Sequence, residues 1–324
     1  MKAIIVDQKQ NLSWEEIDRP VPAPNEILIK VRCAGVNRAD LMQRRGLYMP
    51  PPNTSSILGL ECSGTVELVG KKCRRFKEGD RVCALLSGGG YGEYVVVDET
   101  SALPVPEGFS LEQAAGIPEV FGTAWLNLFH EARLIEGETV LIHAGASGVG
   151  TAAIQLCRLF GCECFVTVGA ESKLKRCRDL GASGGAVRTR KDLWSSIKAF
   201  SEPKGFDVIL DPVGGSYFLS NFSVLAIDGR LVIIGLMGGS KTELNLAEML
   251  TKRIRIIGST LRSRPLFEKA ELMKTLEDRI WPKFESGEIS PVIEKIFPIQ
   301  EAEEAHRFMA SNETIGKLLL IAET

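Results

Sequence analysis

A glycine-rich segment between an apolar strand pattern and an amphipathic helix pattern constrains the fold of this chain most. The segment is HAGASGVGTAAIQL at 143–156, and it follows the apolar run TVLIHA at 139–144. From Val149 to Phe160 the apolar residues share one face of a helix, and Gly161 stands where a C-terminal cap belongs. Strand, glycine turn and helix in this order are typical of a Rossmann unit, in which N–H groups at the helix start face a dinucleotide pyrophosphate.

The glycines of this turn have separate roles in such a unit. Gly145 permits the tight turn, while Gly148 and Gly150 permit close approach of the backbone and packing of the helix. Ser147 occupies the place of the middle glycine, where its hydroxyl either donates to a phosphate or caps the helix.

The residues after the second expected strand bear on the choice between NAD and NADP. An NAD site usually has Asp or Glu there, about 20 residues after the glycines, whereas this chain has Gly169 with Lys173 four residues later. A small residue and a nearby cation favour a 2′-phosphate, and Arg188 is a second cation for it. We therefore expect NADPH. Two alternatives stay open: the cations form only a solvated helix face, or Glu171 holds the ribose of NAD.

The two halves of the chain differ in their pattern of expected strands and helices. After Gly122, apolar β-branched runs alternate with helical patterns, which predicts a doubly wound parallel sheet. Before about residue 118, short β-rich runs are cut by Gly and Pro, as in a small antiparallel barrel. The segment 40–52 ends in three prolines and is expected to be a surface loop. Residues 291–322 read as strand, amphipathic helix, strand, without indicating which half they join.

Charge, cysteines and missing motifs exclude several function classes. The 39 Lys and Arg against 41 Asp and Glu give no field that favours nucleic acid or an anionic membrane, and no stretch is apolar enough for a membrane span. The eight cysteines lack a CxxC pair, so we expect reduced, buried thiols. The apolar run from Ala3 to Val6 is too short for a signal peptide, so we expect a cytoplasmic protein. HExxH and GxxxxGK[ST] are absent, and His143 is expected to be a satisfied core residue. A bound cofactor would then carry the chemistry.

Several longer strings resemble one family over essentially the whole chain. They are NRADLMQRRGLYMPPP (37–52), AAGIPEVFGTAW (114–125), the glycine turn, DPVGG (211–215), IIGLMGG (233–239) and LRSR (261–264). The chain resembles the zinc-free quinone oxidoreductases of the zeta-crystallin type among the medium-chain dehydrogenases/reductases, and within them the tumour-suppressor-induced subgroup. The resemblance implies an α/β protein: a GroES-like β-barrel catalytic domain at 1–120, completed by 266–324, and a Rossmann NADP-binding domain with a doubly wound parallel sheet at 121–265.

The resemblance also implies that no metal is bound. Asn37 stands where zinc-dependent relatives have a ligand cysteine, and Leu60 stands where they have a ligand histidine. The four-cysteine lobe that binds their structural zinc is missing. Without Zn²⁺ as a Lewis acid, reduction of an electron-poor acceptor fits better than oxidation of an alcohol.

The site residues follow from the same resemblance. Asn37 and Tyr48 would border the nicotinamide and the substrate. The residues expected to contact the cofactor are Thr123 at the nicotinamide ribose or phosphate, Ser147, Gly148 and Val149 at the pyrophosphate, Gly169, Lys173 and Arg188 at the 2′-phosphate, Gly235, Leu236 and Met237 along its length, Leu261 near the carboxamide, and Lys317 closing the site.

Each of these roles has a structural alternative. Asn37 would bond only to the local backbone, and Tyr48 would only anchor its loop. Asp40 and Glu61 are expected to be structural partners of Arg38 or of the backbone rather than catalysts. Met237 is equally compatible with a core position.

The function expected from all of this is that of an NADPH:quinone oxidoreductase, which transfers hydride or single electrons to a small-molecule quinone or other electrophile. One alternative is an NADPH-dependent double-bond reductase of enals, enones or enoyl thioesters. Another is a non-catalytic NADPH-binding structural or RNA-associated protein. The strand pattern at 253–261 would form a sheet edge, which predicts a homodimer.

Overall fold

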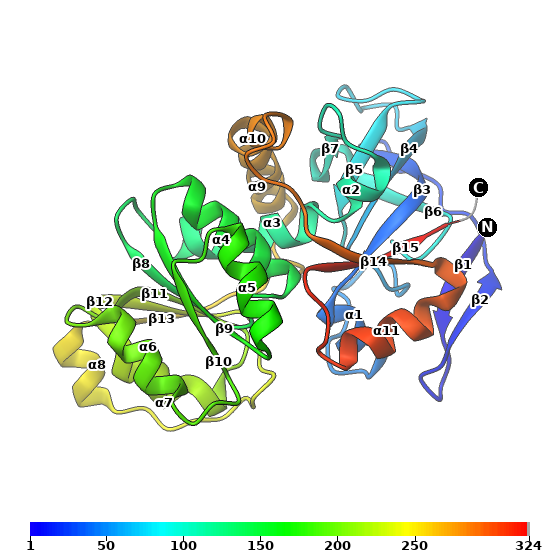
Figure 1. The fold of residues 1–324 in the computed structure, drawn as a ribbon. Helices are drawn as coiled ribbons and strands as arrows, with labels where there is room; N and C mark the ends of the chain where they lie inside the picture. The colour runs from blue at the N-terminus through cyan, green and yellow to red at the C-terminus, as the bar shows by residue number, and fades with distance from the viewer. Residues whose placement is uncertain (323–324) are drawn as a thin grey trace. The chain divides into compact units, whose positions relative to one another are not determined.

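The computed structural model describes residues 1–322 and divides the chain into two compact units. The terminal unit comprises Met1–Gly122 together with the chain from Leu261 onward. The central unit comprises Thr123–Thr260 and is coloured green to yellow in Figure 1.

The central unit contains a six-stranded sheet in the order β10-β9-β8-β11-β12-β13, with all neighbours parallel. Its strands are β8 (Thr139–Ile142), β9 (Glu163–Val168), β10 (Gly184–Val187), β11 (Phe206–Asp211), β12 (Leu225–Ile233) and β13 (Arg255–Gly258). The chain runs outward from β8 to one edge and then from β11 to the other, so the prediction of a doubly wound parallel sheet is confirmed.

Helices connect the strands of this sheet. They are α4 (Gly148–Leu159), α5 (Glu171–Leu180), α6 (Leu193–Ser201), α7 (Gly215–Val224) and α8 (Leu246–Lys252) (Figure 1). Every residue of β11 is buried, which explains why its sequence FDVILD has no alternation of polar and apolar residues.

The terminal unit has a seven-stranded sheet in the order β14-β15-β3-β4-β5-β7, with β6 also paired to β3. The strands are β3 (Glu26–Val36), β4 (Glu61–Val69), β5 (Arg81–Leu85), β6 (Tyr94–Asp98), β7 (Ala102–Pro104), β14 (Ile293–Pro298) and β15 (Lys317–Ile321), beside a hairpin of β1 (Lys2–Val6) and β2 (Leu12–Glu16). Strand β14, helix α11 (Ala302–Ala310) and strand β15 confirm the pattern predicted at 291–322. This segment joins the first half of the chain, because β15 pairs antiparallel with β3.

The remaining α-helices of the described residues were not predicted from the sequence. They are α1 (Arg38–Arg44), α2 (Leu111–Ala115), α3 (Pro118–Trp125), α9 (Leu266–Arg279) and α10 (Trp281–Glu285). The expectation of a surface loop over 40–52 is wrong for residues 40–44, because α1 extends to Arg44, and is confirmed for 45–52, which contain no helix or strand. Asp40 accepts a hydrogen bond from the Asn37 N–H at 2.8 Å, and Leu41 is buried. Both contacts fix the first turn, well before the prolines.

The eight cysteines are all buried and unpaired, as predicted from their spacing. No helix among residues 1–322 is long and apolar enough to span a membrane.

Candidate functional site

Two glycines of the turn in the central unit lie too close to neighbouring atoms to carry a side chain. A Cβ atom on Gly145 would lie 2.6 Å from Val166 Cβ, and one on Gly150 would lie 2.5 Å from the carbonyl oxygen of Ala144. Only glycine fits at either place. Ser147 Oγ accepts a hydrogen bond from the Gly150 N–H at 3.0 Å, so this serine caps α4 as one alternative predicted. The N–H groups of the first helical turn are directed toward the position of a dinucleotide phosphate in a site of this type.

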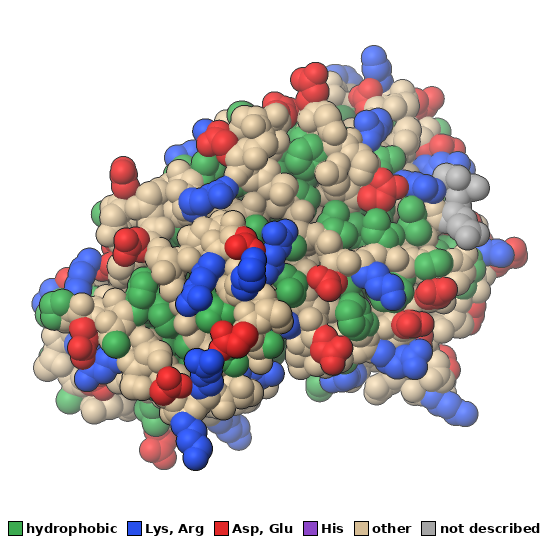
Figure 2. Space-filling model, in the orientation of Figure 1, with side chains coloured by type: hydrophobic (Ala, Val, Ile, Leu, Met, Phe, Trp, Pro, Cys, Tyr) green, Lys and Arg blue, Asp and Glu red, His purple; other side chains and the backbone are tan. Residues whose placement is uncertain are grey.

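Gly169 follows the end of β9 and is exposed. A Cβ atom on Gly169 would lie 3.7 Å from Arg188 Nε, so the two residues expected at a 2′-phosphate are neighbours. Lys173 lies in the first turn of α5 and is partly buried. Glu171, the residue that would favour NAD, forms an exposed ion pair with Arg190 at 2.6 Å. Figure 2 shows blue Lys and Arg side chains over α5 with red carboxylates among them.

The loop after β12 is attached to the loop after β11 through the backbone. The Gly238 N–H donates to the carbonyl oxygen of Val213, and the Gly215 N–H donates to that of Gly239 at 2.8 Å. The loop presents Leu236 and Met237 outward, with 56% and 54% of these residues exposed. The alternative that Met237 is a core residue is therefore wrong.

A buried chain of hydrogen bonds crosses the carboxyl ends of the central strands. His143 Nδ1 lies 2.9 Å from Thr167 Oγ1, and its Nε2 lies 2.7 Å from Asn221 Oδ1. The Asn221 amide donates to Asp211 Oδ2 at 3.0 Å. Burial lowers the pKa of His143, and the nearby Asp211 charge opposes this. The expectation that His143 is a satisfied core residue is confirmed, and the chain ties β8, β9, β11 and α7 together.

In the terminal unit, a buried lysine takes a central position among polar groups. Lys317 Nζ donates to Asn37 Oδ1 at 2.7 Å and to the carbonyl oxygen of Val36 at 2.8 Å, and it lies 2.6 Å from Glu61 Oε1. Asn37 Nδ2 donates to the same carboxylate at 3.0 Å. We call Lys317, Asn37 and Glu61 the lysine cluster. An ammonium group has three N–H donors, so these three acceptors account for all of them. Asn37 thus does more than bond the local backbone.

Asp40 lies beside the lysine cluster and is fully buried. It accepts hydrogen bonds from the N–H groups of Asn37 and Gly59 at 2.8 and 3.0 Å and from the Tyr91 hydroxyl at 3.1 Å. Tyr91 Oη lies 3.2 Å from His306 Nε2. Burial raises the pKa of Asp40 to about 6 and lowers that of His306 to about 3. The expectation that Asp40 bonds the backbone is confirmed.

A second polar group of the terminal unit surrounds Arg262. Its Nε donates to the carbonyl oxygen of Ser87 at 2.9 Å, and its Cζ lies 5.4 Å from the centre of the Tyr48 ring. Lys269 Nζ donates to Ser87 Oγ at 2.7 Å and to the carbonyl oxygen of Arg262 at 2.6 Å. We call Tyr48, Ser87, Arg262 and Lys269 the arginine cluster. Tyr48 is partly buried, which raises its pKa, and the charge of Glu119 adds to this.

Glu119 links the two clusters. Its backbone N–H donates to Glu61 Oε2 at 2.9 Å, and its charge acts on both Tyr48 and Lys269. Burial raises the pKa of the Glu119 carboxyl to about 8, with the Glu61 charge as the next cause. The sequence analysis missed Glu119, Arg262 and Lys269. Glu119 lies in the string AAGIPEVFGTAW and Arg262 in LRSR, but only Thr123 and Leu261 were selected from these two strings.

The structure distributes the predicted residues over both units. Asn37, Tyr48, Leu261 and Lys317 belong to the terminal unit, where Asn37 and Lys317 are in contact and Leu261 is buried. The others belong to the central unit: Ser147, Gly148 and Val149 at the glycine turn, Gly169, Lys173 and Arg188 around the end of β9, Gly235, Leu236 and Met237 after β12, and Thr123, whose carbonyl oxygen accepts from Asn127 Nδ2 at 2.7 Å.

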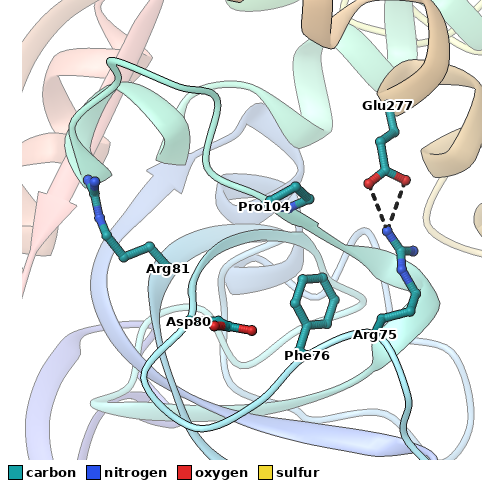
Figure 3. Close-up of a pocket in the computed structure, with 6 residues that line it drawn as sticks. All are labelled: Arg75, Phe76, Asp80, Arg81, Pro104 and Glu277. Atoms are coloured by element: carbon teal, nitrogen blue, oxygen red, sulfur yellow. Dashed lines mark hydrogen bonds and ion pairs between the residues drawn. The ribbon is translucent and has the colours of Figure 1, made fainter.

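A separate surface cavity of about 400 Å³ opens on the terminal unit (Figure 3). It is lined by Arg75, Phe76, Asp80, Arg81, Pro104 and Glu277, with Arg75 and Glu277 paired at 2.9 Å. None of the residues expected at the site contributes to this cavity.

Comparison with known proteins places the two units in known families. Residues 23–107 match the family described as alcohol dehydrogenase GroES-like domain, and residues 148–277 match that described as zinc-binding dehydrogenase. A quinone oxidoreductase of Sus scrofa is 33% identical over 304 residues, which cover 93% of this chain and 91% of that protein. The GroES-like and Rossmann folds are therefore confirmed.

Two solved structures extend this similarity to the whole described fold. A quinone oxidoreductase of Pseudomonas syringae pv. Tomato DC3000 has a TM-score of 0.87 and 28% identity, with 99% of each chain covered. The CurK enoyl reductase has a TM-score of 0.87 and 26% identity, again with 99% of each chain covered.

Zinc, which the name of one matched family implies, does not fit the residues of the terminal unit. The lysine cluster offers one carboxylate and one amide oxygen, and the ammonium of Lys317 already lies against both. Zn²⁺ in proteins is held by thiolates, imidazoles and carboxylates. Among residues 1–322, no group of three or more His, Cys, Asp or Glu side chains is arranged to hold a metal ion.

Proposed function

Because this chain belongs to the quinone oxidoreductase family of the medium-chain dehydrogenases/reductases, we propose that it is an NADPH-dependent reductase of quinones that works without zinc. The observation that carries this proposal is the lysine cluster. There the Lys317 ammonium, and not a metal, balances the charge of Glu61. Without a Lewis acid, the acceptor itself must be electron-poor.

The residues of the central unit support NADPH as the cofactor. Ser147, Gly148 and Val149 hold the pyrophosphate at the start of α4, and Leu236 and Met237 on their exposed loop lie along the cofactor. The reduced nicotinamide supplies the hydride, or single electrons, to the acceptor.

The preference for the phosphorylated cofactor rests on the end of β9. Gly169 leaves space there and Arg188 lies beside it, while Lys173 follows on α5. Glu171, which would hold an unphosphorylated ribose, is paired with Arg190. A guanidinium group beside an open backbone position suits a phosphate better than a hydroxyl.

The terminal unit supplies the acceptor side of the reaction. Asn37 is held in one orientation by Lys317 and Glu61, and Tyr48 presents a hydroxyl whose raised pKa keeps it protonated at neutral pH. Tyr48 donates a hydrogen bond to the acceptor. A quinone that gains a hydride and one proton becomes a hydroquinone, and water can deliver that proton.

The alternative activity is reduction of the carbon–carbon double bond of enals, enones or enoyl thioesters. The structural similarity to the CurK enoyl reductase favours this candidate. Here hydride adds to one carbon and leaves a carbanion, so a positioned donor such as Tyr48 is needed much more than with a quinone. A non-catalytic NADPH-binding role is the third candidate, and binding without turnover of any acceptor would favour it.

One experiment separates these candidates. NADPH oxidation is followed with an ortho-quinone, a 2-alkenal and an enoyl thioester, using the natural protein and Tyr48→Phe. We expect the quinone to be the best acceptor and to retain most of its rate in Tyr48→Phe. Faster turnover of the alkenal or thioester, lost in Tyr48→Phe, would favour the double-bond reductase instead.

We further propose that the protein is a cytoplasmic homodimer. Strand β13 lies at the edge of the central sheet, and Leu246 and Leu250 on α8, the helix that precedes it, are 69% and 77% exposed. An uncovered strand edge favours continuation of the sheet into a second copy. The unpaired cysteines suit a reducing compartment. Sedimentation at micromolar concentration tests the dimer, which a monomeric mass would contradict.

A further inference from the structure

Arg262 carries two polar atoms that the rest of the described chain leaves without a partner. The residue is 3% exposed, yet within residues 1–322 neither Nη1 nor Nη2 has a hydrogen-bond partner. Only Nε is used, in the bond to the carbonyl oxygen of Ser87. A buried N–H group of a charged side chain that makes no hydrogen bond costs free energy. The two free nitrogens therefore mark a position where a ligand with an acceptor oxygen would bind favourably.

The surroundings of Arg262 keep it in place and keep it positive. Lys269 donates both to Ser87 Oγ and to the carbonyl oxygen of Arg262. One ammonium group therefore holds the backbone of Arg262 and also Ser87, the residue to which Arg262 Nε is hydrogen-bonded. Burial lowers the pKa of Arg262, and the negative charge of Asp40 acts in the opposite direction. Guanidinium groups stay protonated in proteins, so a positive charge persists at this position.

The two free nitrogens belong to the same cluster as Tyr48, the residue proposed to contact the acceptor. A fixed cation in a buried environment forms a site for an oxygen that becomes negative during a reaction. Glu119 does not cancel this charge at neutral pH, because its raised pKa of about 8 leaves most of its carboxyl groups protonated there.

We propose that Arg262 binds the carbonyl oxygen of the acceptor through Nη1 and Nη2 and stabilises the negative charge that this oxygen gains on reduction. The inference rests on the proposed reductase function and adds a catalytic residue to it. It assigns the acceptor to the class of conjugated carbonyl compounds, in which the charge from an incoming hydride is delocalised onto an oxygen.

The electron balance of the step is simple. One carbonyl oxygen of the quinone receives the hydride as a C–H bond of the reduced nicotinamide breaks, and the pair of electrons from that bond forms the new O–H bond. A π-electron pair of the quinone is displaced through the conjugated ring onto the other carbonyl oxygen. The resulting oxyanion lies against the Arg262 guanidinium and then takes one proton from water. The products are a hydroquinone and the oxidised cofactor.

The test uses two variants of Arg262 and one matched control. Arg262→Met removes the charge, whereas Arg262→Lys keeps the charge and removes the paired donors. The control is Arg264→Met, two residues away, because Arg264 forms an ion pair with Glu268 at 2.8 Å. For quinone reduction we expect Arg262→Met to lower kcat/KM about 100-fold, the typical loss for one oxyanion donor, and Arg262→Lys to lie in between. Arg264→Met should stay within about twofold of the natural protein, as expected when a pair near the surface is lost.

A binding measurement makes the test independent of turnover. In the presence of NADP⁺, the coloured anion of 2-hydroxy-1,4-naphthoquinone is titrated into each protein. We expect the natural protein to bind the anion in preference to its protonated form and Arg262→Met to bind it at least tenfold more weakly. The affinity for NADPH should be equal in all four proteins.

Two results would overturn the inference. One is that the Arg262 variants show the same quinone kinetics and the same anion binding as the natural protein. If Arg262→Met does not fold, Arg262→Lys is used alone for this comparison. The other is a loss of NADPH affinity that accounts for the whole effect, which would make Arg262 a cofactor ligand. If the natural protein reduces no quinone, the proposed function fails, while the anion titration still tests Arg262.

Discussion

Lys317 Nζ lies 2.6 Å from Glu61 Oε1, and the two side chains are 3% and 0% exposed. A buried ion pair is costly to form from water and more costly to break on one side, because the remaining charge then has no partner. The pair lies at the start of β15 and of β4, so it links the C-terminal strand of the chain to the first half. The same pair fixes Asn37 through both ends of its amide.

Lys317→Met should destabilise the terminal unit by about 3–5 kcal/mol, the usual effect of removing one partner of a buried pair. Urea denaturation measures this loss. The double variant Lys317→Met with Glu61→Gln should recover part of it, because no uncompensated carboxylate remains. Strictly additive losses in the two single variants and the double variant would show that the pair has no coupling.

Gly169→Asp should weaken the preference for NADPH over NADH. A carboxylate at the end of β9 would repel the 2′-phosphate and would accept hydrogen bonds from an unphosphorylated ribose. We expect the ratio of kcat/KM for NADPH over NADH to fall at least tenfold. Arg253→Ala is the control, because Arg253 forms an exposed ion pair with Asp228, which has no part in the cofactor assignment, and should leave the ratio unchanged. A ratio that already favours NADH in the natural protein would refute the assignment.

Ser147→Ala and Gly150→Ala separate capping from close packing at the glycine turn. Ser147→Ala loses the hydrogen bond from the Gly150 N–H and should cost about 1 kcal/mol of stability. Gly150→Ala places a methyl group 2.5 Å from two carbonyl oxygens, so it should abolish NADPH binding and lower the melting temperature much further. Calorimetric titration and thermal melting check both. Equal effects of the two variants would contradict this explanation.

His306 should make stability sensitive to acid. Its folded pKa is lowered to about 3 from the ordinary value of 6.5, so in this range only the unfolded chain takes up the proton. The contribution of His306 to the free energy of unfolding is therefore fully present above its ordinary pKa and is lost as the pH falls toward 3. The groups that face it are Tyr91, hydrogen-bonded to Asp40, and Arg44, whose charge lowers the pKa further.

His306→Phe removes this dependence. The stability advantage of the natural protein over the variant should shrink between about pH 7.5 and about pH 4.5, as urea denaturation at each pH would show. The opposite dependence of Asp40, whose pKa is raised to about 6, is present in both proteins and largely cancels in this comparison. A pH-independent difference would show that the pKa of His306 is the same in the folded and unfolded states, which contradicts the prediction.

The elements that were predictable from the sequence are those with strong local signals. The glycine turn, the apolar runs of the central sheet and the strand, helix, strand pattern at 291–322 each depend on spacing along the chain. Helix α1 was missed because its start depends on one side chain: Asp40 closes the first turn, while the neighbouring prolines suggest a loop.

The polar clusters were less accessible to sequence reasoning because they assemble residues far apart in the chain. Lys317 reaches Asn37 across 280 positions, and Lys269 reaches Ser87 across 182. Nothing in the local pattern around Arg262 indicates that two of its nitrogens lack partners. Such a property belongs to the packed structure alone.

The central claim is that this protein transfers reducing equivalents from NADPH to quinones without a metal ion. The most direct test measures NADPH oxidation with an ortho-quinone after exhaustive chelation, together with the metal content of the same sample. We predict an undiminished rate in protein that contains no zinc. A rate that is lost on chelation and restored by one equivalent of zinc would contradict the account.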